Sequence, residues 1–138
     1  FFSRILAISA FISVDSGVDQ LQCRSQPLTI ILGNLFENAL KYAPEQSCIN
    51  IAISPRGSEI GVLGIQISVA NLPGPSGFPS SQQAFEKYHR GTHTSRQAGF
   101  GLGLYLVKTI ADQQGWKIEY TPTDTQVIFR LWIPLSPR

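Results

Sequence analysis

The chain has 138 residues, of which 43% are hydrophobic and 14% are charged, and its formal net charge is +2. This length and composition are typical of one globular domain with a full core, and they argue against an intrinsically disordered chain. The eleven Lys and Arg residues are scattered along the sequence, so they form no basic block that would indicate binding to nucleic acid or to a membrane surface.

An apolar stretch opens the chain at residues 1–14. Arg4 and three serines interrupt this stretch, so it falls short of the roughly 20 apolar residues that a membrane-spanning helix needs. It also lacks the small-residue cleavage site of a secretory signal peptide. We therefore expect residues 1–138 to form a single domain, in which residues 1–11 are a candidate stub of an upstream linker or helix.

Residues 11–24 alternate weakly between apolar and polar side chains, which predicts one or two short strands. A helix is expected to follow, because Ser25 or Gln26 can cap it and Pro27 suits its first turn, where a missing N–H costs nothing. Pro44 ends this helix. Its buried stripe is predicted from apolar residues at helical spacing: Leu28, Ile31, Leu32, Leu35 and Ala39.

The next two strands and a long irregular segment follow this helix. Residues 48–54 and 62–70 alternate as strands do, and residues 55–61 supply the turn of an antiparallel hairpin. From Pro73 to Ser81, eight of nine residues are Gly, Pro or Ser, and the sequence stays irregular to about residue 99. A stretch of this length inside a compact domain is usually functional or mobile.

The C-terminal part predicts a second helix and a closing hairpin. The helix begins near residues 101–102 and runs to Gln114, after which Gly115 ends it. Residues 116–121 and 126–134 then alternate as two strands. The whole order predicts an α+β fold, a two-layer sandwich with a mixed, largely antiparallel sheet packed on helices. The apolar faces of the second helix are predicted to be Leu102, Leu106, Val107, Ile110 and Ala111.

The first helix also carries a polar stripe. Its members, at i, i+4, i+7 and i+8, share one side of the helix. An Asn carbonyl is a hard oxygen donor for Mg²⁺, a lysine neutralises phosphate charge, and a tyrosine ring packs on a base, so the stripe suits a ligand better than a core. An ordinary solvated face explains the same pattern, and the stripe alone does not decide between the two. The four residues are Asn34, Asn38, Lys41 and Tyr42.

Residues 99–104, Gly-Phe-Gly-Leu-Gly-Leu, open the second helix. Glycines let a backbone approach a phosphate closely, and a helix N-terminus offers free N–H groups and a partial positive charge. A Rossmann motif would need a preceding strand and a glycine three residues after Gly101, where Leu104 stands. A Walker loop would need Gly-Lys-Ser/Thr, which is absent. The alternative is a glycine-rich turn that only permits tight packing.

Taken together, these segments resemble the histidine kinase ATPase domain of the GHKL superfamily, which has the Bergerat ATP-binding fold. Residues 34–42 match the N box of that family, and residues 99–104 match its second glycine box. Residues 85–91 lie between them and resemble the F box, an aromatic-rich segment that ends in Arg-Gly. Three motifs in the right order make the resemblance specific, and it covers roughly residues 12–135.

The resemblance implies a role for each residue of the polar stripe and for the irregular segment. Asn38 would coordinate Mg²⁺, Asn34 and Lys41 would approach the phosphates of ATP, and Tyr42 would lie beside the adenine. Residues 72–100 would form a mobile lid over ATP. The candidate phosphate contacts from the lid and the second glycine box are Arg90, Gly99, Gly101, Leu102, Gly103 and Leu104.

One motif departs from the family pattern. The first glycine box of the family is Asp-x-Gly-x-Gly, and its Asp accepts a hydrogen bond from the adenine amino group. In this chain Asn71 stands in place of the Asp, while Gly74 and Gly77 remain as candidate contacts between prolines. The Asn carbonyl can accept the same bond, although a neutral acceptor is weaker than a charged one. Its NH₂ group can instead face a carbonyl of the base, which would relax base choice, and both orientations stay open.

The expected partners follow from the resemblance and from the lack of a histidine that looks like a phosphoacceptor. Kinases of this family transfer the γ-phosphoryl group to a histidine on a separate helical dimerisation domain. This chain has only His89 and His93, and neither is followed by an acidic residue. The resemblance therefore implies an ATP site whose phosphoacceptor lies on another domain of the same full-length kinase, with a response regulator downstream. We expect this chain alone to be a monomer.

Two cysteines, Cys23 and Cys48, are too few for a disulfide framework and form no zinc-binding pair, so we expect reduced thiols. With the resemblance, this predicts a cytoplasmic domain at the inner end of a membrane-anchored sensor. Two alternatives stand beside the kinase. One is a degenerate nucleotide-binding or docking module. The other is a different ATPase of the superfamily, such as an anti-sigma serine kinase or a mismatch-repair or gyrase-like domain, although the last two types usually carry Glu where this chain has Asn34.

Overall fold

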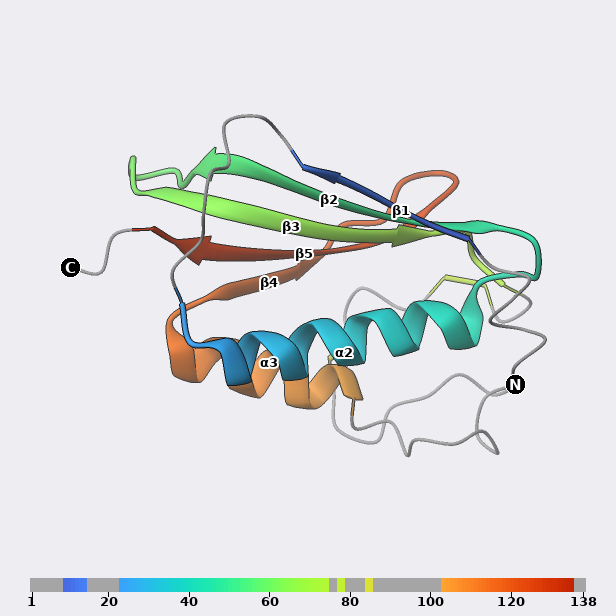
Figure 1. The fold of residues 1–138 in the computed structure, drawn as a ribbon, viewed down its shortest axis with the longest axis horizontal. Helices are drawn as coiled ribbons and strands as arrows, with labels where there is room; N and C mark the ends of the chain where they lie inside the picture. Colours follow the sequence, from blue (N-terminus) through green and yellow to red (C-terminus); the bar gives the residue numbers. More distant parts are fainter. Residues whose placement is uncertain (1–8, 15–22, 75–76, 79–83, 86–102, 136–138) are drawn as a thin grey trace.

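A sheet of five strands, covered on one face by two helices, makes up the part of the protein that the computed structural model describes, residues 9–14, 23–74, 77–78, 84–85 and 103–135 (Figure 1). The two-layer α+β sandwich predicted from the sequence is confirmed. In chain order the elements are β1 (Ser9–Val14), α2 (Ser25–Tyr42), β2 (Cys48–Gly57), β3 (Leu63–Asn71), α3 (Gly103–Gln114), β4 (Lys117–Tyr120) and β5 (Val127–Pro134).

The strand order in the sheet is β1-β2-β3-β5-β4. β1 pairs with β2 in parallel, whereas the β2–β3, β3–β5 and β4–β5 pairs are antiparallel. A parallel pair needs a crossover connection, and α2 supplies it between β1 and β2. The sheet is therefore mixed but largely antiparallel, as predicted.

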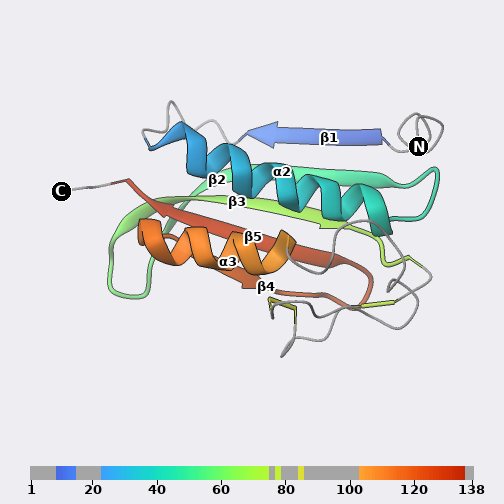
Figure 2. The same cartoon turned by 90° about the horizontal axis from the view of Figure 1, so that it is seen from below.

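Both helices lie side by side on the same face of the sheet (Figures 1 and 2). α2 buries Ile31, Leu35 and Ala39 at successive i+4 positions, and α3 buries Val107 and Ala111 with the same spacing. Burial of a Leu or Ile side chain contributes about 1.5–3 kcal/mol, so these stripes help to hold the two layers together. From the sheet, the core receives alternate residues of β3 and β5, namely Ile65, Ile67, Val69, Val127, Phe129, Leu131 and Ile133.

The sequence predicted four features of the helix ends, and the structure confirms three of them. Ala43 is extended because it precedes Pro44, and its N–H still bonds the Ala39 carbonyl. Gly115 has a positive φ of 77°, the conformation that ends α3. Pro27 lies in the first turn of α2 as expected. The predicted cap is wrong, because Arg24 occupies the N-cap position and its side chain makes no capping hydrogen bond.

Three expectations about boundaries and faces need correction. β1 begins at Ser9, so residues 9–11 belong to the sheet and not to an upstream stub. Of the predicted strand region, residues 15–22 lie outside the described residues. β2 continues through Pro55 to Gly57, and the turn falls later, where the Ser58 N–H bonds the Val62 carbonyl at 2.8 Å. Leu106 is 41% exposed because it lies away from the buried face of α3.

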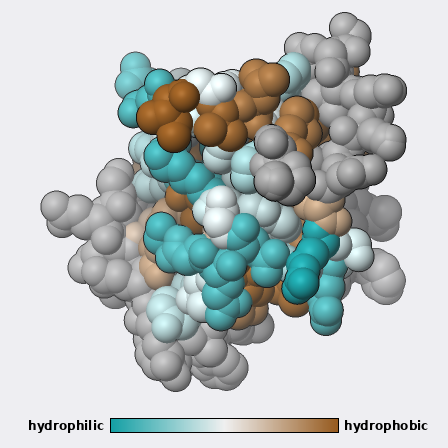
Figure 3. Space-filling model, turned by 90° about the vertical axis from the view of Figure 1, so that its left-hand side faces the viewer, coloured by the Kyte–Doolittle hydropathy of each residue, from teal (hydrophilic) through white to brown (hydrophobic). Residues whose placement is uncertain are grey.

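One end of the molecule carries exposed apolar side chains. At the end of the molecule that carries the β2–β3 turn, apolar side chains gather on the sheet side of a surface that is otherwise largely polar (Figure 3). Ile60 of that turn is 87% exposed and Leu63, which begins β3, is 68% exposed.

Cys23 and Cys48 are both free and half-buried, and burial raises the pKa of the Cys23 thiol. Within the described residues, no helix is both long and apolar enough to cross a bilayer.

Candidate nucleotide-binding site

The polar stripe occupies the C-terminal half of α2, on the helix face next to α3. Asn34, Asn38, Lys41 and Tyr42 are all half-buried, whereas a fully solvated face would leave them exposed. Their half-burial fits side chains that border a shared space between elements. The structure thus brings all four predicted stripe residues together on α2.

The amide of Asn34 is oriented by its own helix. Its Nδ2 donates a hydrogen bond to the Ile30 carbonyl at 2.8 Å. The other end of the amide, Oδ1, faces the first residue of α3, because a Cβ added to Gly103 would lie only 3.0 Å from it. A helix N-terminus carries free N–H groups and a partial positive charge. The N box and the second glycine box therefore meet where α3 begins.

The first glycine box closes against the end of α2. A Cβ added to Gly74 would overlap the Tyr42 carbonyl oxygen, so only glycine allows this approach of two backbones. Gly77 has a positive φ of 78°, and its N–H bonds the Gly74 carbonyl at 2.9 Å. The two glycines are thus required for different reasons, one for a close contact and one for a backbone conformation that L side chains rarely adopt.

Asn71 ends β3 on the side of the sheet that carries the helices. It lies on the same face of β3 as buried Val69, pairs with Val127 of β5 and is itself only 3% exposed. Its Nδ2 donates a hydrogen bond to the Leu72 carbonyl at 2.7 Å. Among the described residues, none donates a hydrogen bond to its Oδ1 atom. Asn71 is therefore a buried polar residue at the sheet end nearest Gly74, with a fixed amide orientation.

Part of the segment predicted as a lid belongs to the core. Ala84 is only 7% exposed, and the ring of Phe85 meets that of Phe129 edge-on at a centroid distance of 5.7 Å. Tyr120 stacks on the same Phe129 ring from 5.0 Å, and burial raises the pKa of its phenol. The expectation that all of residues 72–100 form a mobile lid is therefore wrong at residues 84 and 85, where Phe85, the first residue of the F box, packs on Phe129 of β5.

The remaining predicted contacts divide between described and undescribed residues. Gly103 and Leu104 begin α3, and Leu104 packs partly against the core. Arg90, Gly99, Gly101 and Leu102 lie outside the described residues. Sequence reasoning missed the carbonyls of Ile30 and Leu72, which orient the two amides. Every residue carries such a carbonyl, so no residue type signals them.

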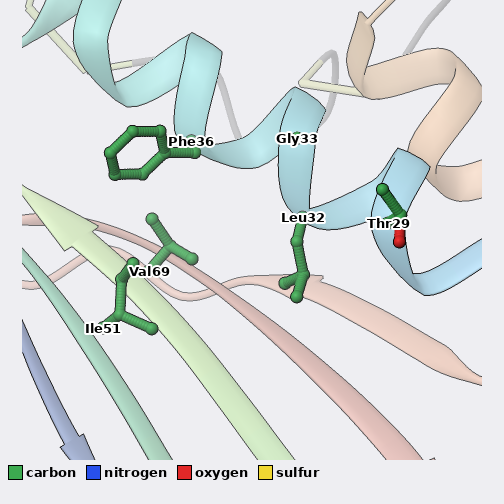
Figure 4. Close-up of a pocket in the computed structure, with 6 residues that line it drawn as sticks. All are labelled: Thr29, Leu32, Gly33, Phe36, Ile51 and Val69. Atoms are coloured by element: carbon green, nitrogen blue, oxygen red, sulfur yellow. The ribbon is translucent and has the colours of Figure 1, made fainter. Parts of the chain in front are cut away.

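A separate apolar cavity of about 410 Å³ lies between α2 and the sheet (Figure 4). Leu32, Ile51 and Val69 point into the space between the helix and the strands, as Figure 4 shows. The α2 residues that line it are on the side of the helix opposite the polar stripe, by helical periodicity. None of the predicted nucleotide contacts lines this cavity, so it is distinct from the candidate nucleotide site. Its lining comprises Thr29, Leu32, Gly33, Phe36, Ile51 and Val69.

Known proteins resemble this chain in sequence. Residues 23–137 match the family described as histidine kinase-, DNA gyrase B- and HSP90-like ATPases. The sensor histidine kinase HprS of Escherichia coli is 32% identical over 104 residues, which are 75% of this chain and 22% of that protein. The swarming motility regulation sensor protein RssA of Serratia marcescens is 38% identical over 114 residues, which are 80% of this chain and 23% of that protein.

The fold has solved counterparts as well. The catalytic domain of the histidine kinase ThkA superposes with a TM-score of 0.76 at 22% identity, covering 96% of this chain and 82% of that one. The mycobacterial sensor histidine kinase MprB gives a TM-score of 0.73 at 20% identity, covering 99% of this chain and 87% of that one. At these identities the likeness shows the fold alone.

The chain therefore belongs to the family of histidine kinase-, DNA gyrase B- and HSP90-like ATPases. Within that family it corresponds to the ATP-binding catalytic domain of sensor kinases. It spans about a fifth of the length of the curated relatives quoted above, 22% and 23%.

Proposed function

We propose that this domain binds Mg-ATP beside the C-terminal half of α2 and transfers the γ-phosphoryl group to a histidine on a separate dimerisation domain of the same full-length kinase. The observation that carries the proposal is the approach of Asn34 Oδ1 to Gly103, because it joins the amide stripe of the N box to the N-terminus of α3. One element offers oxygen ligands for a metal and the other offers N–H donors for phosphate.

The donor set of α2 fits a magnesium ion. Mg²⁺ keeps most of its waters and takes few protein ligands, so one or two amide oxygens satisfy it. Asn38 is the proposed ligand. Asn34 uses its Nδ2 on the Ile30 carbonyl, so it presents its oxygen toward the phosphate region, either to the metal or to a metal-bound water. When bound, Mg²⁺ neutralises phosphate charge.

The other residues position the nucleotide. Lys41 and the first N–H groups of α3 balance the negative charge of the phosphates, and Arg90 adds a further cation from the lid. Tyr42 packs beside the adenine, whose amino group donates to Asn71. Phosphoryl transfer needs little covalent help from the protein, so this positioning and charge neutralisation account for catalysis.

The proposed setting is a longer sensor protein. Both curated relatives are named as sensors, and this chain corresponds to about a fifth of each. We place the domain in the cytoplasm at the inner end of a membrane-anchored protein, with the phosphoacceptor histidine on an adjoining domain and a response regulator as the next acceptor.

Binding of Mg-ATP to this chain is tested by calorimetric titration with ATP, with and without Mg²⁺. Asn38→Ala should weaken Mg-ATP binding at least tenfold and remove the dependence on Mg²⁺, while the melting temperature stays close to that of the wild type. Glu37→Ala is the matched control, because Glu37 is the exposed neighbour on the same helix. Failure to bind ATP at millimolar concentration would instead favour a degenerate docking module.

The transfer step is tested on the full-length protein with γ-labelled ATP. We expect incorporated phosphate that is labile in acid and stable in base, as a phosphohistidine is, and no incorporation in the Asn38→Ala variant. Label that survives acid would indicate a hydroxyl acceptor and would favour a serine kinase of the same superfamily.

A further inference from the structure

The helix-bearing face of the sheet becomes less covered toward its β1 edge. Ile12 of β1 pairs with Ile51 of β2, and Ile51 pairs with Val69 of β3, so the three side chains point to the same face. Val69 is 3% exposed, Ile51 is half-buried and Ile12 is 66% exposed. Figure 2 views the molecule from the side that carries the helices, and neither α2 nor α3 lies in front of β1.

The next row across the sheet repeats this gradient. Ile67 of β3 is 2% exposed, Ile53 of β2 is half-buried and Val14 of β1 is 55% exposed. Burial of apolar side chains is the main favourable term in folding, and this face of the sheet is the one that packs on helices. Within the described residues, however, neither helix covers the end of either row.

The cavity beside α2 adjoins this exposed edge. Leu32 and Phe36 of α2 line the cavity together with Ile51, which is also the neighbour of Ile12 in the sheet (Figure 4). The cavity and the edge are therefore parts of one apolar surface between α2 and β1. We call it the β1 apolar surface, and it consists of Ile12, Leu32, Phe36, Ile51 and Val69.

The chain enters β1 from residues 1–8, which lie outside the described residues. In that sequence, apolar residues recur at i, i+1, i+4 and i+7, the pattern of an amphipathic helix. Ser3, Arg4 and Ala7 fall on the opposite side of such a helix. The segment next to the β1 apolar surface thus has an apolar stripe of its own. The stripe comprises Phe1, Phe2, Ile5 and Ile8.

The reach of the segment matches the nearer part of this surface. A connection to β1 takes about two residues, and the remaining six span about 9 Å as a helix. Ile12 lies three residues into β1, about 10 Å from its start. Phe36 lies six residues before the end of α2, about 9 Å from the same end of the molecule. Gly33 lies about one helical turn further along α2, beyond this reach.

We propose that residues 1–8 form an amphipathic helical segment that docks on the β1 apolar surface, with its apolar stripe against Ile12, Ile51 and Phe36. The occupant is the chain's own N-terminal segment, not a second copy or a separate apolar ligand. The segment contacts the side of α2 opposite the polar stripe, so it does not compete with a nucleotide. This inference does not depend on the proposed function, since the docked surfaces include none of the proposed ATP contacts.

Docking is tested by the rate at which iodoacetamide labels the thiol of an Ile12→Cys variant, with the labelled residue assigned by mass spectrometry. The reference is Ile60→Cys, because Ile60 is 87% exposed in the β2–β3 turn. The Ile12→Cys thiol should react about tenfold more slowly than the Ile60→Cys thiol, because burial of several apolar side chains makes the docked state the main population.

Two matched substitutions in the segment identify the occupant. Added to Ile12→Cys, Ile5→Asp places a charge on the apolar stripe and should bring the labelling rate to within about twofold of the Ile60→Cys rate. Ser3→Asp adds the same charge to the polar side and should leave the slow rate unchanged. Circular dichroism checks that each variant is folded, and Phe2→Asp is a second stripe variant with the same expected result as Ile5→Asp.

Four results would overturn the proposal. One is a thiol of Ile12→Cys that reacts as fast as that of Ile60→Cys. Another is slow labelling that persists in both Ile5→Asp and Phe2→Asp. Protection that disappears on dilution would show that a second copy covers the surface, and protection lost after refolding from denaturant would show a copurified apolar molecule. No nucleotide is present in these measurements, so failure of docking is recognised separately from failure of the ATP site.

Discussion

At the residue scale, the site depends on contacts that a side chain would destroy. Gly74 lies against a main-chain carbonyl of Tyr42, whereas Gly103 lies against the flexible amide of Asn34. The first contact cannot be relieved by a rotamer change, because neither partner is a side chain. The second can be relieved if Asn34 turns. The two glycines should therefore respond differently to the same substitution.

Gly74→Ala should lower the free energy of unfolding by about 1–3 kcal/mol, since the added methyl group forces a backbone shift at the junction of the first glycine box with α2. It should also weaken ATP binding, because the same shift moves the sheet end that carries Asn71. Urea denaturation and nucleotide titration check the two effects. Gly103→Ala is the comparison, and a larger stability loss there than at Gly74 would contradict this account.

The candidate site was predictable at this scale as far as residue types allow. Helical spacing placed Asn34, Asn38, Lys41 and Tyr42 on one face, and they share it. The orientation of Asn34 and Asn71 was not predictable, because main-chain carbonyls set it. The sequence left both ends of the Asn71 amide open, and only the hydrogen bond to Leu72 distinguishes them.

At the scale of elements, α2 contains a glycine that nothing in the described structure requires. A Cβ added to Gly33 would meet no atom within 4 Å, and the residue is in the helix interior on an exposed position. Glycine costs about 1 kcal/mol relative to alanine in such a position. Gly33→Ala should therefore stabilise the domain by up to about 1 kcal/mol in urea denaturation. A destabilised variant would mean that a group outside the described residues occupies this space.

The F box anchor gives a second prediction for an element. Phe85→Ala should lower the free energy of unfolding by about 2 kcal/mol, because it removes the edge-on contact with Phe129. The loss should be smaller than for a fully buried phenylalanine, because Phe85 is half-buried. The matched control is Phe78→Ala, because Phe78 is 42% exposed and its loss should change stability by no more than about 0.5 kcal/mol. Equal losses in chemical denaturation would place Phe85 outside the core.

Element types were predictable from periodicity, but some of their bounds were not. Pro55 indicated a turn, since proline cannot donate to a strand ladder. The described part of β1 pairs with β2 only as far as Val14 with Ile53, so no described residue pairs with Pro55 on that side of β2, and the missing N–H of the proline breaks no described β1–β2 hydrogen bond. Where one strand can contain a proline thus depends on how far its neighbour pairs with it, and the local sequence does not encode that pairing.

At the scale of the whole molecule, the layers followed from the order of elements, whereas the arrangement within the sheet did not. The two hairpins were predicted as antiparallel pairs and are confirmed. The parallel β1–β2 pair and the place of β5 between β3 and β4 join segments far apart in the chain. Apolar alternation specifies which face of a strand is buried but not which strand lies beside it.

The last prediction concerns the stability of the whole domain. A ligand that binds only the folded state stabilises it by RT ln(1 + [L]/Kd), about 2.7 kcal/mol when free ligand is a hundredfold above Kd. For a domain of 138 residues, that corresponds to a rise in melting temperature of about 8 °C, at about 3 °C per kcal/mol. Mg-ATP should produce this shift in a thermal melt of the wild type and of Glu37→Ala. At the same ligand concentration Asn38→Ala should lose about half of it or more, because a Kd raised tenfold removes about 1.3 kcal/mol. A full shift in Asn38→Ala would show that other residues hold the metal and the phosphates. If the melting temperature of the wild type did not rise at a hundredfold excess of ligand over the calorimetric Kd, the nucleotide would also bind the unfolded chain.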